Sequence, residues 1–418
     1  MTTFALVDCN NFYCSCERLF RPELRNVPVA VLSNNDGCIV ARSQEVKDLS
    51  IKMATPLFKV IDQIKQHQVQ VFSSNYTLYA DISSRVMQTL EQFTPNLEVY
   101  SIDEAFLDLS GFSHLEEHAQ KIKTTVYQHV GVPVCVGIAP TKTLAKLASY
   151  AAKKFKATAG VVDLSDPVRQ KKLLGITPVA EVWGVGRKHS EKLKRIGITT
   201  ALQLAQMDSN RARRLYSIVM ERTIRELNGE ACIEIDHSPA AKQQIMCSRS
   251  FGEKITDYST LRETICEFAA RATEKLRGEK QLARVVNVFA RTSPFMKTAP
   301  IYSNSATGKL PQPSADTREI LSLTVKLFDS IWKDDYRYAK AGVMLGDFYS
   351  PEQTQYDLFH PQPGDTHRDK LMQAVDSINH SGLGQIWFGG QRPKQDWFMN
   401  QTHLSPAYTT RWDCLPLV

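Results

Sequence analysis

The sequence lacks the features of a secreted or membrane-spanning protein. Its first twelve residues contain no basic stretch and include Asp8, and no window of about 18 consecutive apolar residues occurs anywhere. The nine cysteines are an odd number without a CxxC pair or a His at zinc-binding spacing, which favours reduced thiols. Internal repeats and low-complexity tracts are also missing. We therefore expect a cytoplasmic protein with no membrane segment.

The length and charge of the chain point to several domains and a basic middle third. A chain of 418 residues is too long for one ordinary core and predicts roughly two to four domains. The net charge is +7, but residues 141–225 hold eighteen Lys or Arg against six Asp or Glu, a local +12 that leaves −5 elsewhere. Such a block is as often a solvated face as a binding surface, and a nucleic-acid backbone is its leading specific partner.

Three short apolar runs predict strands in the first half of the chain. They cover residues 4–7, which Asp8 follows directly, residues 99–109 and residues 132–138. A helix is expected between the second and third strands, and Thr141 is expected to cap another helix after the third. This alternation indicates a palm-like α+β layer.

The later regions differ in pattern. Short helices with Gly punctuation are predicted over residues 178–205, which indicates a small helical domain. Residues 248–292 and 339–348 alternate helix and strand patterns and include a long amphipathic helix at 261–276, so a separate α/β domain is expected there. Beyond residue 350 a Pro-containing linker precedes one further helix-like piece at 369–378.

Two adjacent carboxylates, Asp103 and Glu104, lie inside an apolar run. Burial there is costly unless a partner compensates the charge, and a metal ion is the obvious partner. Asp8, at the end of another predicted strand, completes a possible three-carboxylate cluster whose hard oxygen ligands suit Mg²⁺. Two such ions about 3.5 to 4 Å apart support nucleotidyl transfer. Nucleotide cyclases place carboxylates on a similar sheet, so the spacing alone leaves both activities open.

Longer strings of sequence carry a family resemblance. DCNNFY at residues 8–13 followed by YSIDEAF at residues 100–106 resembles the two palm motifs of Y-family DNA polymerases, the error-prone lesion-bypass class. The resemblance is closest to the UmuC type, the catalytic subunits of DNA polymerase V. It extends through SNNDGC (33–38), FSSNYTLYA (72–80), GIAPTKTLAK (137–146), CSRSFGEKITDY (247–258) and the segments 341–348 and 404–410.

The resemblance implies an α+β multidomain fold, a right-hand polymerase with a ferredoxin-like palm, small fingers, a helical thumb and an α/β little finger. The expected domains are the palm (1–20 and 78–165), the fingers (21–77), the thumb with a helix-hairpin-helix (166–235), the little finger (243–350) and a C-terminal tail (351–418). It also implies error-prone translesion synthesis in the SOS response to DNA damage, with transfer of dNMP to a primer 3′-hydroxyl by two Mg²⁺ ions.

The resemblance also assigns residues to the active site. Asp8, Asp103 and Glu104 would hold the metal ions, together with the carbonyl oxygen of Cys9. Tyr13 falls at the steric-gate position, where an aromatic ring would clash with a ribose 2′-hydroxyl.

Three other residues are expected near the incoming nucleotide. Phe12 lies beside the gate, and its bulk is better explained by core packing. Lys47 and Lys153 match positions whose basic side chains reach the triphosphate. Residues 43–47 read SQEVK where many relatives read NYEAR, so a Tyr that contacts the triphosphate is missing. Lys47 also replaces an Arg that could bind bidentately.

The string WGVGR in the basic block resembles the helix-hairpin-helix of the thumb. Backbone amides and basic side chains there would bind DNA phosphates without reading bases. The residues concerned are Gly184, Gly186, Arg187 and Lys188.

Partners implied by the resemblance are primer-template DNA, dNTP, a UmuD′ dimer, a RecA filament and the bacterial sliding clamp. A short QxxLF-like peptide in the linker would bind the clamp through Gln355, Leu358 and Phe359. Two alternatives remain, a DinB-type polymerase that works without UmuD′ and a non-catalytic DNA-binding or clamp-binding scaffold. The C-terminal tail argues against the first, and the intact carboxylates argue against the second.

Overall fold

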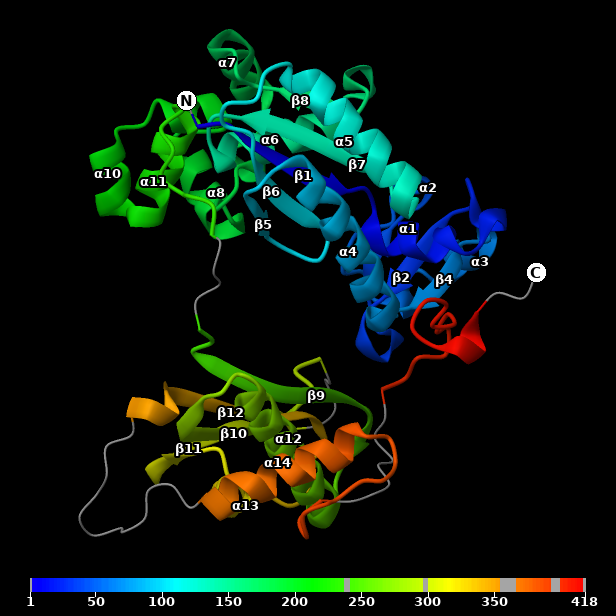
Figure 1. Cartoon of the computed structure of the whole chain (residues 1–418), viewed down its shortest axis with the longest axis vertical. Helices are drawn as coiled ribbons and strands as arrows, with labels where there is room; N and C mark the ends of the chain where they lie inside the picture. The colour runs from blue at the N-terminus through cyan, green and yellow to red at the C-terminus, as the bar shows by residue number, and fades with distance from the viewer. Residues whose placement is uncertain (1, 237–240, 296–299, 354–365, 392–398, 416–418) are drawn as a thin grey trace. The chain divides into compact units, whose positions relative to one another are not determined.

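The computed structural model divides the chain into two units. It describes residues 2–236, 241–295, 300–353, 366–391 and 399–415. Unit 1 comprises Met1–Pro239 with Thr402–Val418, and unit 2 comprises Ala240–Gln401. Figure 1 shows helices packed on sheets in each unit. No helix among the described residues is both long and apolar enough to cross a bilayer. All nine cysteines are free thiols.

A five-stranded sheet forms the centre of unit 1. Its strands, in spatial order, are β5 (Leu97–Val99), β6 (Glu104–Asp108), β1 (Phe4–Cys9), β7 (Val134–Ala139) and β8 (Val161–Asp163). The first three pairings are antiparallel, and β7 pairs with β8 in parallel. The prediction of one strand over residues 99–109 is wrong, because the backbone turns there. The amides of Tyr100 and Ser101 both donate to the carbonyl of Glu104, at 3.1 Å, and so split the run into two strands.

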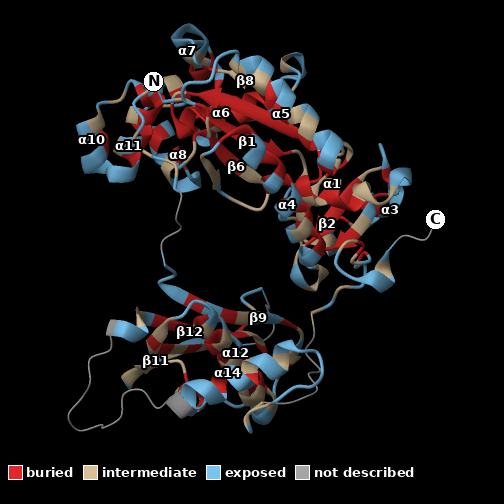
Figure 2. Ribbon diagram, in the orientation of Figure 1, coloured by how far each residue is buried: buried red, intermediate tan, exposed pale blue. Residues whose placement is uncertain are grey.

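Helices cover both faces of this sheet, which explains why every residue of β1 is buried (Figure 2). Phe4 and Leu6 pack on the face covered by α6 (Lys142–Lys154), whereas Ala5 and Val7 face the core that includes α4 (Tyr76–Leu90) and α5 (Leu115–Val130). The predicted cap of α6 is confirmed, since the Thr141 side chain accepts a hydrogen bond from the Leu144 amide.

A glycine lets α6 lie directly on the sheet. A Cβ atom added to Gly137 on β7 would approach the backbone nitrogen of Ser149 to 2.2 Å and the carbonyl of Ala145 to 2.5 Å. No side chain fits at that distance, so helix and strand are in backbone contact at this point.

Two further groups of elements complete unit 1. A three-stranded sheet of order β3-β2-β4 has its own core, and the helices of residues 167–227 share the core on the α6 face. The first group contains β2 (Val29–Leu32), β3 (Ile39–Arg42), α2 (Gln44–Asp48), α3 (Ile61–Gln66) and β4 (Gln70–Ser73), and α1 (Phe12–Leu19) joins it to the core on the α4 and α5 face. The helices on the α6 face are α7 (Pro167–Ile176), α8 (Arg187–Arg195), α9 (Ala201–Ala205), α10 (Ser209–Leu215) and α11 (Ile218–Leu227).

Unit 2 is a four-stranded antiparallel sheet with two long helices. The strands, in spatial order, are β11 (Ser303–Ser314), β10 (Leu282–Thr292), β12 (Tyr338–Tyr349) and β9 (Gln244–Ile255). The helices α12 (Tyr258–Gly278) and α13 (Thr317–Ile331) pack on the sheet, and α12 confirms the amphipathic helix predicted at 261–276. Short 3₁₀ turns among the described residues lie at Pro22–Leu24, Asn34–Asp36, Leu57–Lys59, Glu91–Phe93, Lys156–Thr158, Val179–Glu181, Pro351–Gln353 and Trp412–Cys414.

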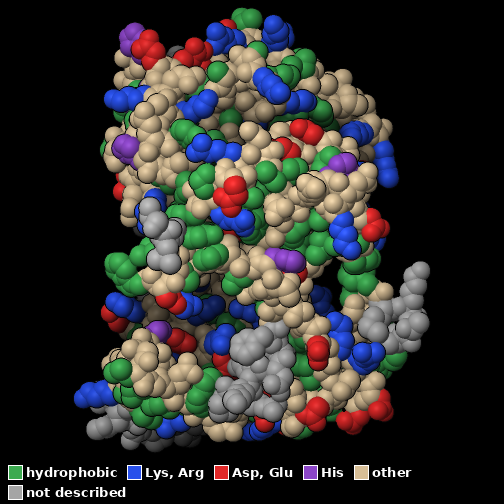
Figure 3. All heavy atoms as spheres, turned by 90° about the vertical axis from the view of Figure 1, so that its right-hand side faces the viewer, with side chains coloured by type: hydrophobic (Ala, Val, Ile, Leu, Met, Phe, Trp, Pro, Cys, Tyr) green, Lys and Arg blue, Asp and Glu red, His purple; other side chains and the backbone are tan. Residues whose placement is uncertain are grey.

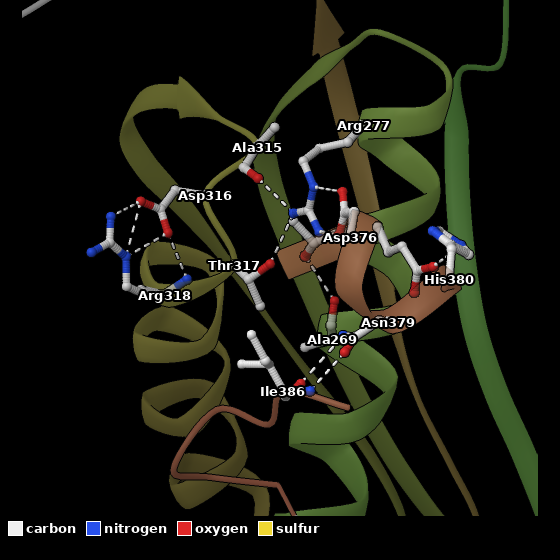
Figure 4. A network of polar contacts seen from close by, with 12 residues as sticks. Ala269, Arg277, Ala315, Asp316, Thr317, Arg318, Asp376, Asn379, His380 and Ile386 are labelled. Atoms are coloured by element: carbon white, nitrogen blue, oxygen red, sulfur yellow. Dashed lines mark hydrogen bonds and ion pairs between the residues drawn. The ribbon is translucent and has the colours of Figure 1, made fainter. Parts of the chain in front are cut away.

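The segment predicted as one C-terminal tail is divided between the units. Helix α14 (Thr366–His380) packs on unit 2, where the guanidinium of Arg277 donates two hydrogen bonds to Asp376, at 2.5 and 2.6 Å, and one to Thr317 (Figure 4). The amide of Ile386 then donates to Asn379 at 2.7 Å, which closes the loop after α14. Residues 402–418, by contrast, belong to unit 1.

Candidate active site

Asp8 and Glu104 lie opposite each other at the ends of two neighbouring strands. Asp8 on β1 is the register partner of Glu104 on β6, and the Cys9 amide donates to the Asp103 carbonyl at 2.9 Å. The side chains of Asp8 and Glu104 share a hydrogen bond. The sheet register therefore brings together two acids that are 96 positions apart in the sequence.

Burial and charge give these two carboxyl groups different proton affinities. Burial raises the pKa of Asp8 to about 7; Lys153 opposes the shift, and the hydrogen bond that the Asp8 carboxyl donates to Glu104 adds to it. Burial acts to raise the pKa of Glu104 too, but the hydrogen bond with Asp8 and the ammonium of Lys146 hold it below its usual range. The pair therefore shares charge unequally, with the higher pKa on Asp8 and the lower one on Glu104.

The third acid has a different neighbour. Oδ1 of Asp103 accepts a hydrogen bond from Ser101 Oγ at 2.7 Å, and Ser101 Oγ in turn accepts from the Glu104 amide at 3.1 Å. Lys146 lies 2.8 Å from Glu104, and Lys153 forms an ion pair with Asp8. Within the described ranges, no three His, Cys, Asp or Glu side chains converge to hold a metal ion. The three-carboxylate cluster therefore stays a prediction.

The chemistry of the donor set nevertheless fits a divalent cation. The oxygens at these strand ends are carboxylates and backbone carbonyls, the hard ligands that Mg²⁺ prefers. A positive charge already compensates Asp8, because the ammonium of Lys153 is paired with it. Burial raises the pKa of the Cys9 thiol above its usual range, so this thiol is neutral and leaves the Cys9 carbonyl as the donor.

Lys146 is held by aromatic rings as well as by Glu104. Its ammonium lies 4.1 Å from the ring centre of Tyr100, 5.4 Å from Trp183 and 5.7 Å from Phe106, and its side chain is 15% exposed. The partly desolvated rings strengthen this cation–π contact. Sequence reasoning missed Lys146, although it lies in the string GIAPTKTLAK. The signal was the lysine spacing along α6, which brings Lys146 to the carboxylate end of the sheet.

Lys47, Arg42 and Lys153 form a group of three cations, of which Lys153 is paired with Asp8. Lys47 on α2 donates to Asn11 Oδ1 at 2.6 Å, and burial, Arg42 and Lys153 together lower the pKa of Lys47. The two lysines that the resemblance assigned to the triphosphate are therefore close enough to repel each other. Arg42, at the end of β3, is a third member that sequence reasoning missed. Mutual repulsion of this kind favours binding of an anion between the cations.

Tyr13 on α1 is surrounded by aromatic rings. Its ring stacks on Tyr79, with centroids 4.3 Å apart and planes at 16°, and meets the edge of Tyr76 at 6.2 Å. Phe12 is buried in the core of unit 1 and lies 5.8 Å from Tyr13. The half-exposed ring of Tyr13 is therefore oriented by neighbours that are more than sixty positions away.

The predicted phosphate-binding loop lies before α8. Gly184 has φ of 87°, and Gly186 is the N-cap of α8 with no side-chain hydrogen bond to the first amides. Arg187 and Lys188 are exposed, with Arg187 at 88% and 3.5 Å from Glu191. The element directly before the loop is a 3₁₀ turn, Val179–Glu181, where a helix-hairpin-helix would have an α-helix. Free amides and exposed cations at a helix start suit a phosphate.

Two further predictions concern the basic surface for DNA and the clamp-binding peptide. On the face drawn in Figure 3, Lys and Arg side chains are mixed with Asp, Glu and uncharged ones, and its described atoms form no continuous basic patch. The predicted clamp-binding residues Gln355, Leu358 and Phe359 lie outside the described residues.

Comparison with known proteins matches the chain to one family over most of its length. Residues 7–150 match the impB/mucB/samB family, and residues 242–358 match the C-terminal domain of that family. Residues 369–418 match a domain of unknown function, DUF4113. Protein ImpB and Protein UmuC of Salmonella typhimurium are 49% and 50% identical to the chain, over 99% of it and 99% of their own lengths. DNA polymerase IV 1 of Bacillus subtilis is 29% identical over 89% of each chain.

Solved structures support the fold. A chimera of the Y-family DNA polymerases Dbh and Dpo4 superposes with a TM-score of 0.65 at 21% identity, covering 83% of this chain and 99% of the chimera. An insertion ternary complex of Dbh DNA polymerase gives 0.56 at 20% identity, over 83% and 99%. The predicted right-hand architecture is thereby confirmed.

Proposed function

The chain belongs to the impB/mucB/samB family of UmuC-type Y-family DNA polymerases, and we propose that the paired carboxylates of Asp8 and Glu104 are the centre of its polymerase site. Its activity is DNA-directed DNA synthesis of the error-prone translesion class, and the family assigns it to the SOS response. Identity with UmuC and ImpB far exceeds the 29% with DNA polymerase IV 1, which favours the UmuC type over the DinB-type alternative.

One observation carries the location of the site. Asp8 and Glu104 share a hydrogen bond at the strand ends of a sheet covered on both faces, and each also faces a lysine ammonium. A stability role alone gives no reason to bury two acids side by side, because the desolvation cost is large and a hydrophobic pair would serve as well. Perturbed carboxyl groups of this kind are typical of reaction centres.

Y-family polymerases use divalent metal ions, and we propose two Mg²⁺ here. Asp8, Asp103, Glu104 and the carbonyl of Cys9 would hold them, and the ions would supply the Lewis acidity that activates a primer 3′-hydroxyl and stabilises the departing pyrophosphate. Ser101 orients the Asp103 carboxylate, and Lys146 orients that of Glu104. Each contact restrains one of the two carboxylates that would bind the ions.

The neighbouring side chains account for substrate binding. Lys47, Lys153 and Arg42 form the cationic group that attracts the triphosphate of an incoming dNTP. The ring of Tyr13 stands where the sugar would lie and excludes a ribose 2′-hydroxyl by steric contact. In the thumb, the amides at Gly184 and Gly186 with Arg187 and Lys188 bind the phosphates of primer-template DNA without base recognition.

Three protein partners belong to the same proposal. As a UmuC-type polymerase the chain would work with a UmuD′ dimer and a RecA filament, in the cytoplasm at the nucleoid. Gln355, Leu358 and Phe359 would anchor it to the sliding clamp, since a few apolar anchors carry most of a short peptide's affinity. Such tethering raises the local concentration of an enzyme that otherwise binds DNA through salt-sensitive charge.

Primer extension by the full chain tests the proposal. With Mg²⁺, we expect dNMP incorporation on undamaged templates and extension past a lesion when UmuD′ and RecA are added. Absence of incorporation under all these conditions, in a protein that still binds primer-template DNA, would favour the non-catalytic scaffold. Incorporation on damaged templates that is independent of UmuD′ would favour the DinB-type alternative.

A further inference from the structure

A buried hydrogen bond holds the ring that supports Tyr13. The hydroxyl of Tyr79 donates to Glu17 Oε1 at 2.6 Å, and both side chains are fully buried. Tyr79 on α4 is also the ring on which Tyr13 stacks. Because Glu17 lies one helical turn after Tyr13 on α1, the bond ties the two helices together beside the stack.

The C-terminal segment supplies the second donor to the same carboxyl group. Ser405 Oγ donates to Glu17 Oε1 at 3.1 Å, across 388 positions of sequence. The other oxygen, Oε2, is buried and has no hydrogen-bond partner among the described residues. Burial raises the pKa of Glu17 to about 7, although the hydrogen bonds from Tyr79 and Ser405 and the charge of Arg21 act to lower it. Among the described residues Arg21 pairs with Glu23, so the hydrogen bonds to Glu17 come from two neutral hydroxyl groups.

Asn75 connects the same segment to the start of α4. Its side-chain oxygen accepts from the Leu78 amide and caps the helix, and its amide group donates to the carbonyls of Ser405 and Pro406, at 3.1 and 3.2 Å. The first turn of α4 carries Tyr76 and Tyr79. The C-terminal segment thus fixes the backbone from which both aromatic neighbours of Tyr13 project.

A third contact reaches the end of α1. Tyr408 stacks on Phe20, with centroids 4.6 Å apart and planes at 14°. The backbone of His403 also exchanges hydrogen bonds with Ser73, which extends the edge of β4. Residues 402–408 therefore contact both helices that present the Tyr13–Tyr79 stack.

From these contacts we propose that Glu17, Tyr79 and Ser405 form a positioning network that fixes the ring of Tyr13 and thereby sets the selection of dNTP over rNTP. The C-terminal segment, whose family match has no assigned function, completes this network. The inference rests on the proposed role of Tyr13 as the steric gate. None of the three residues touches the nucleotide; each acts through the position of Tyr13.

The physical reason is the precision that steric exclusion needs. A ring that can tilt away by a fraction of an ångström no longer excludes one hydroxyl group, while a deoxyribose is accepted in either position. Stacking on Tyr79 restrains Tyr13 only if Tyr79 is itself restrained. Its hydroxyl bond to Glu17 supplies that restraint, and Ser405 holds Glu17 from the other side.

Steady-state incorporation opposite an undamaged base tests the network in the full chain. The measured quantity is the ratio of kcat/KM for dNTP to that for the matching rNTP. The variants are Tyr79→Phe, which keeps the stacked ring, Ser405→Ala, Glu17→Leu and the conservative Glu17→Gln. Tyr338→Phe, which removes a buried tyrosine hydroxyl in unit 2, and Thr410→Ala, whose hydroxyl bonds within the C-terminal segment, are the matched controls. Tyr13→Ala reports on the gate itself.

We expect Tyr79→Phe and Ser405→Ala each to lower the ratio about three- to tenfold, the size of one lost buried hydrogen bond, mainly through faster rNTP use. Glu17→Gln keeps the acceptor and should retain the parent ratio, whereas Glu17→Leu should not. If Glu17→Leu fails to fold, Tyr79→Phe and Ser405→Ala still test whether the network affects the ratio. Parent-like ratios in both of them, with a large loss in Tyr13→Ala, would overturn the network and leave the gate standing. A parent-like ratio in Tyr13→Ala would overturn the gate itself.

Discussion

Two regions of unit 1 bury an acidic side chain to a similar depth, yet surround it in opposite ways. Asp8 at the end of β1 is 5% exposed, Glu17 in α1 is fully buried, and burial raises the pKa of each to about 7. Asp8 faces another carboxyl group and a lysine, so charge of both signs is concentrated there. Glu17 faces two neutral hydroxyl groups.

The difference indicates what each region does. Unbalanced charge at the strand ends is costly for folding and useful for binding a cation and phosphates. A neutral acceptor between two hydroxyl donors binds no ion, but it holds three chain segments in one arrangement. We therefore expect the first region to serve the chemistry and the second to position side chains.

The largest effect should follow from removing a charge in the first region. We expect Asp103→Asn to lower nucleotide incorporation by on the order of 1,000-fold or more while DNA binding stays close to that of the parent, because the amide keeps the shape and loses the charge. Primer extension and a DNA band-shift titration measure the two properties. Asp163→Asn is the control, since Asp163 lies on β8 of the same sheet and its side chain accepts hydrogen bonds from the nearby Ser165. Normal extension by Asp103→Asn would remove this residue from the site.

The second effect concerns the ring that connects the two regions. Tyr13→Ala should lower discrimination between dNTP and rNTP by on the order of 100-fold, because no side chain remains to exclude the 2′-hydroxyl. The rate with dNTP should change much less. Phe12→Leu is the comparison, since Phe12 is buried beside Tyr13 and should affect folding stability more than selectivity. Equal losses of selectivity in the two variants would mean that general packing, and not the Tyr13 ring, determines the discrimination between dNTP and rNTP.

The third effect is a pH dependence of stability that originates in the neutral region. The pKa of Glu17 is about 7 in the folded state against an ordinary value of 4.5, so the folded state binds more protons between these pH values. The free energy of unfolding should therefore fall as the pH rises from about 4.5 to 7, by on the order of 2 kcal/mol. Denaturant titrations of the parent and of Glu17→Gln at several pH values measure this free energy. The free energy of unfolding of Glu17→Gln should fall less over this pH range than that of the parent. If the parent and the variant show the same pH dependence, Glu17 stays ionised in the folded state.

The smallest effect on unassisted synthesis is expected outside both regions. Leu358→Ala combined with Phe359→Ala should leave primer extension without a clamp unchanged and remove its stimulation by a DNA-loaded sliding clamp. Gln312→Ala, a change on β11 of unit 2 away from the proposed peptide in sequence, should keep the stimulation. Clamp binding that survives the double change would place the contact elsewhere, and reduced unassisted extension would show that these side chains pack internally.

Local sequence was sufficient for the features that depend on neighbouring residues. The strand that ends at Asp8, the cap at Thr141 and the helix within residues 258–278 all follow from periodicity or from a capping side chain. The acids Asp103 and Glu104 were identified because charge inside an apolar run is rare. The family itself was recognised from short strings and is confirmed by relatives at about 50% identity.

Only the tertiary structure decided the features that depend on distant contacts. The backbone turn after Val99 splits one apolar run into two strands, and the cage of rings around Lys146 joins α6 to the thumb residue Trp183. The bond between Glu17 and Ser405 spans almost the whole chain. No periodicity marks such a pair, because its two members become neighbours only when the C-terminal segment packs against unit 1. Sequence thus determined which residues are the candidates for the chemistry, and packing determined which side chains surround them.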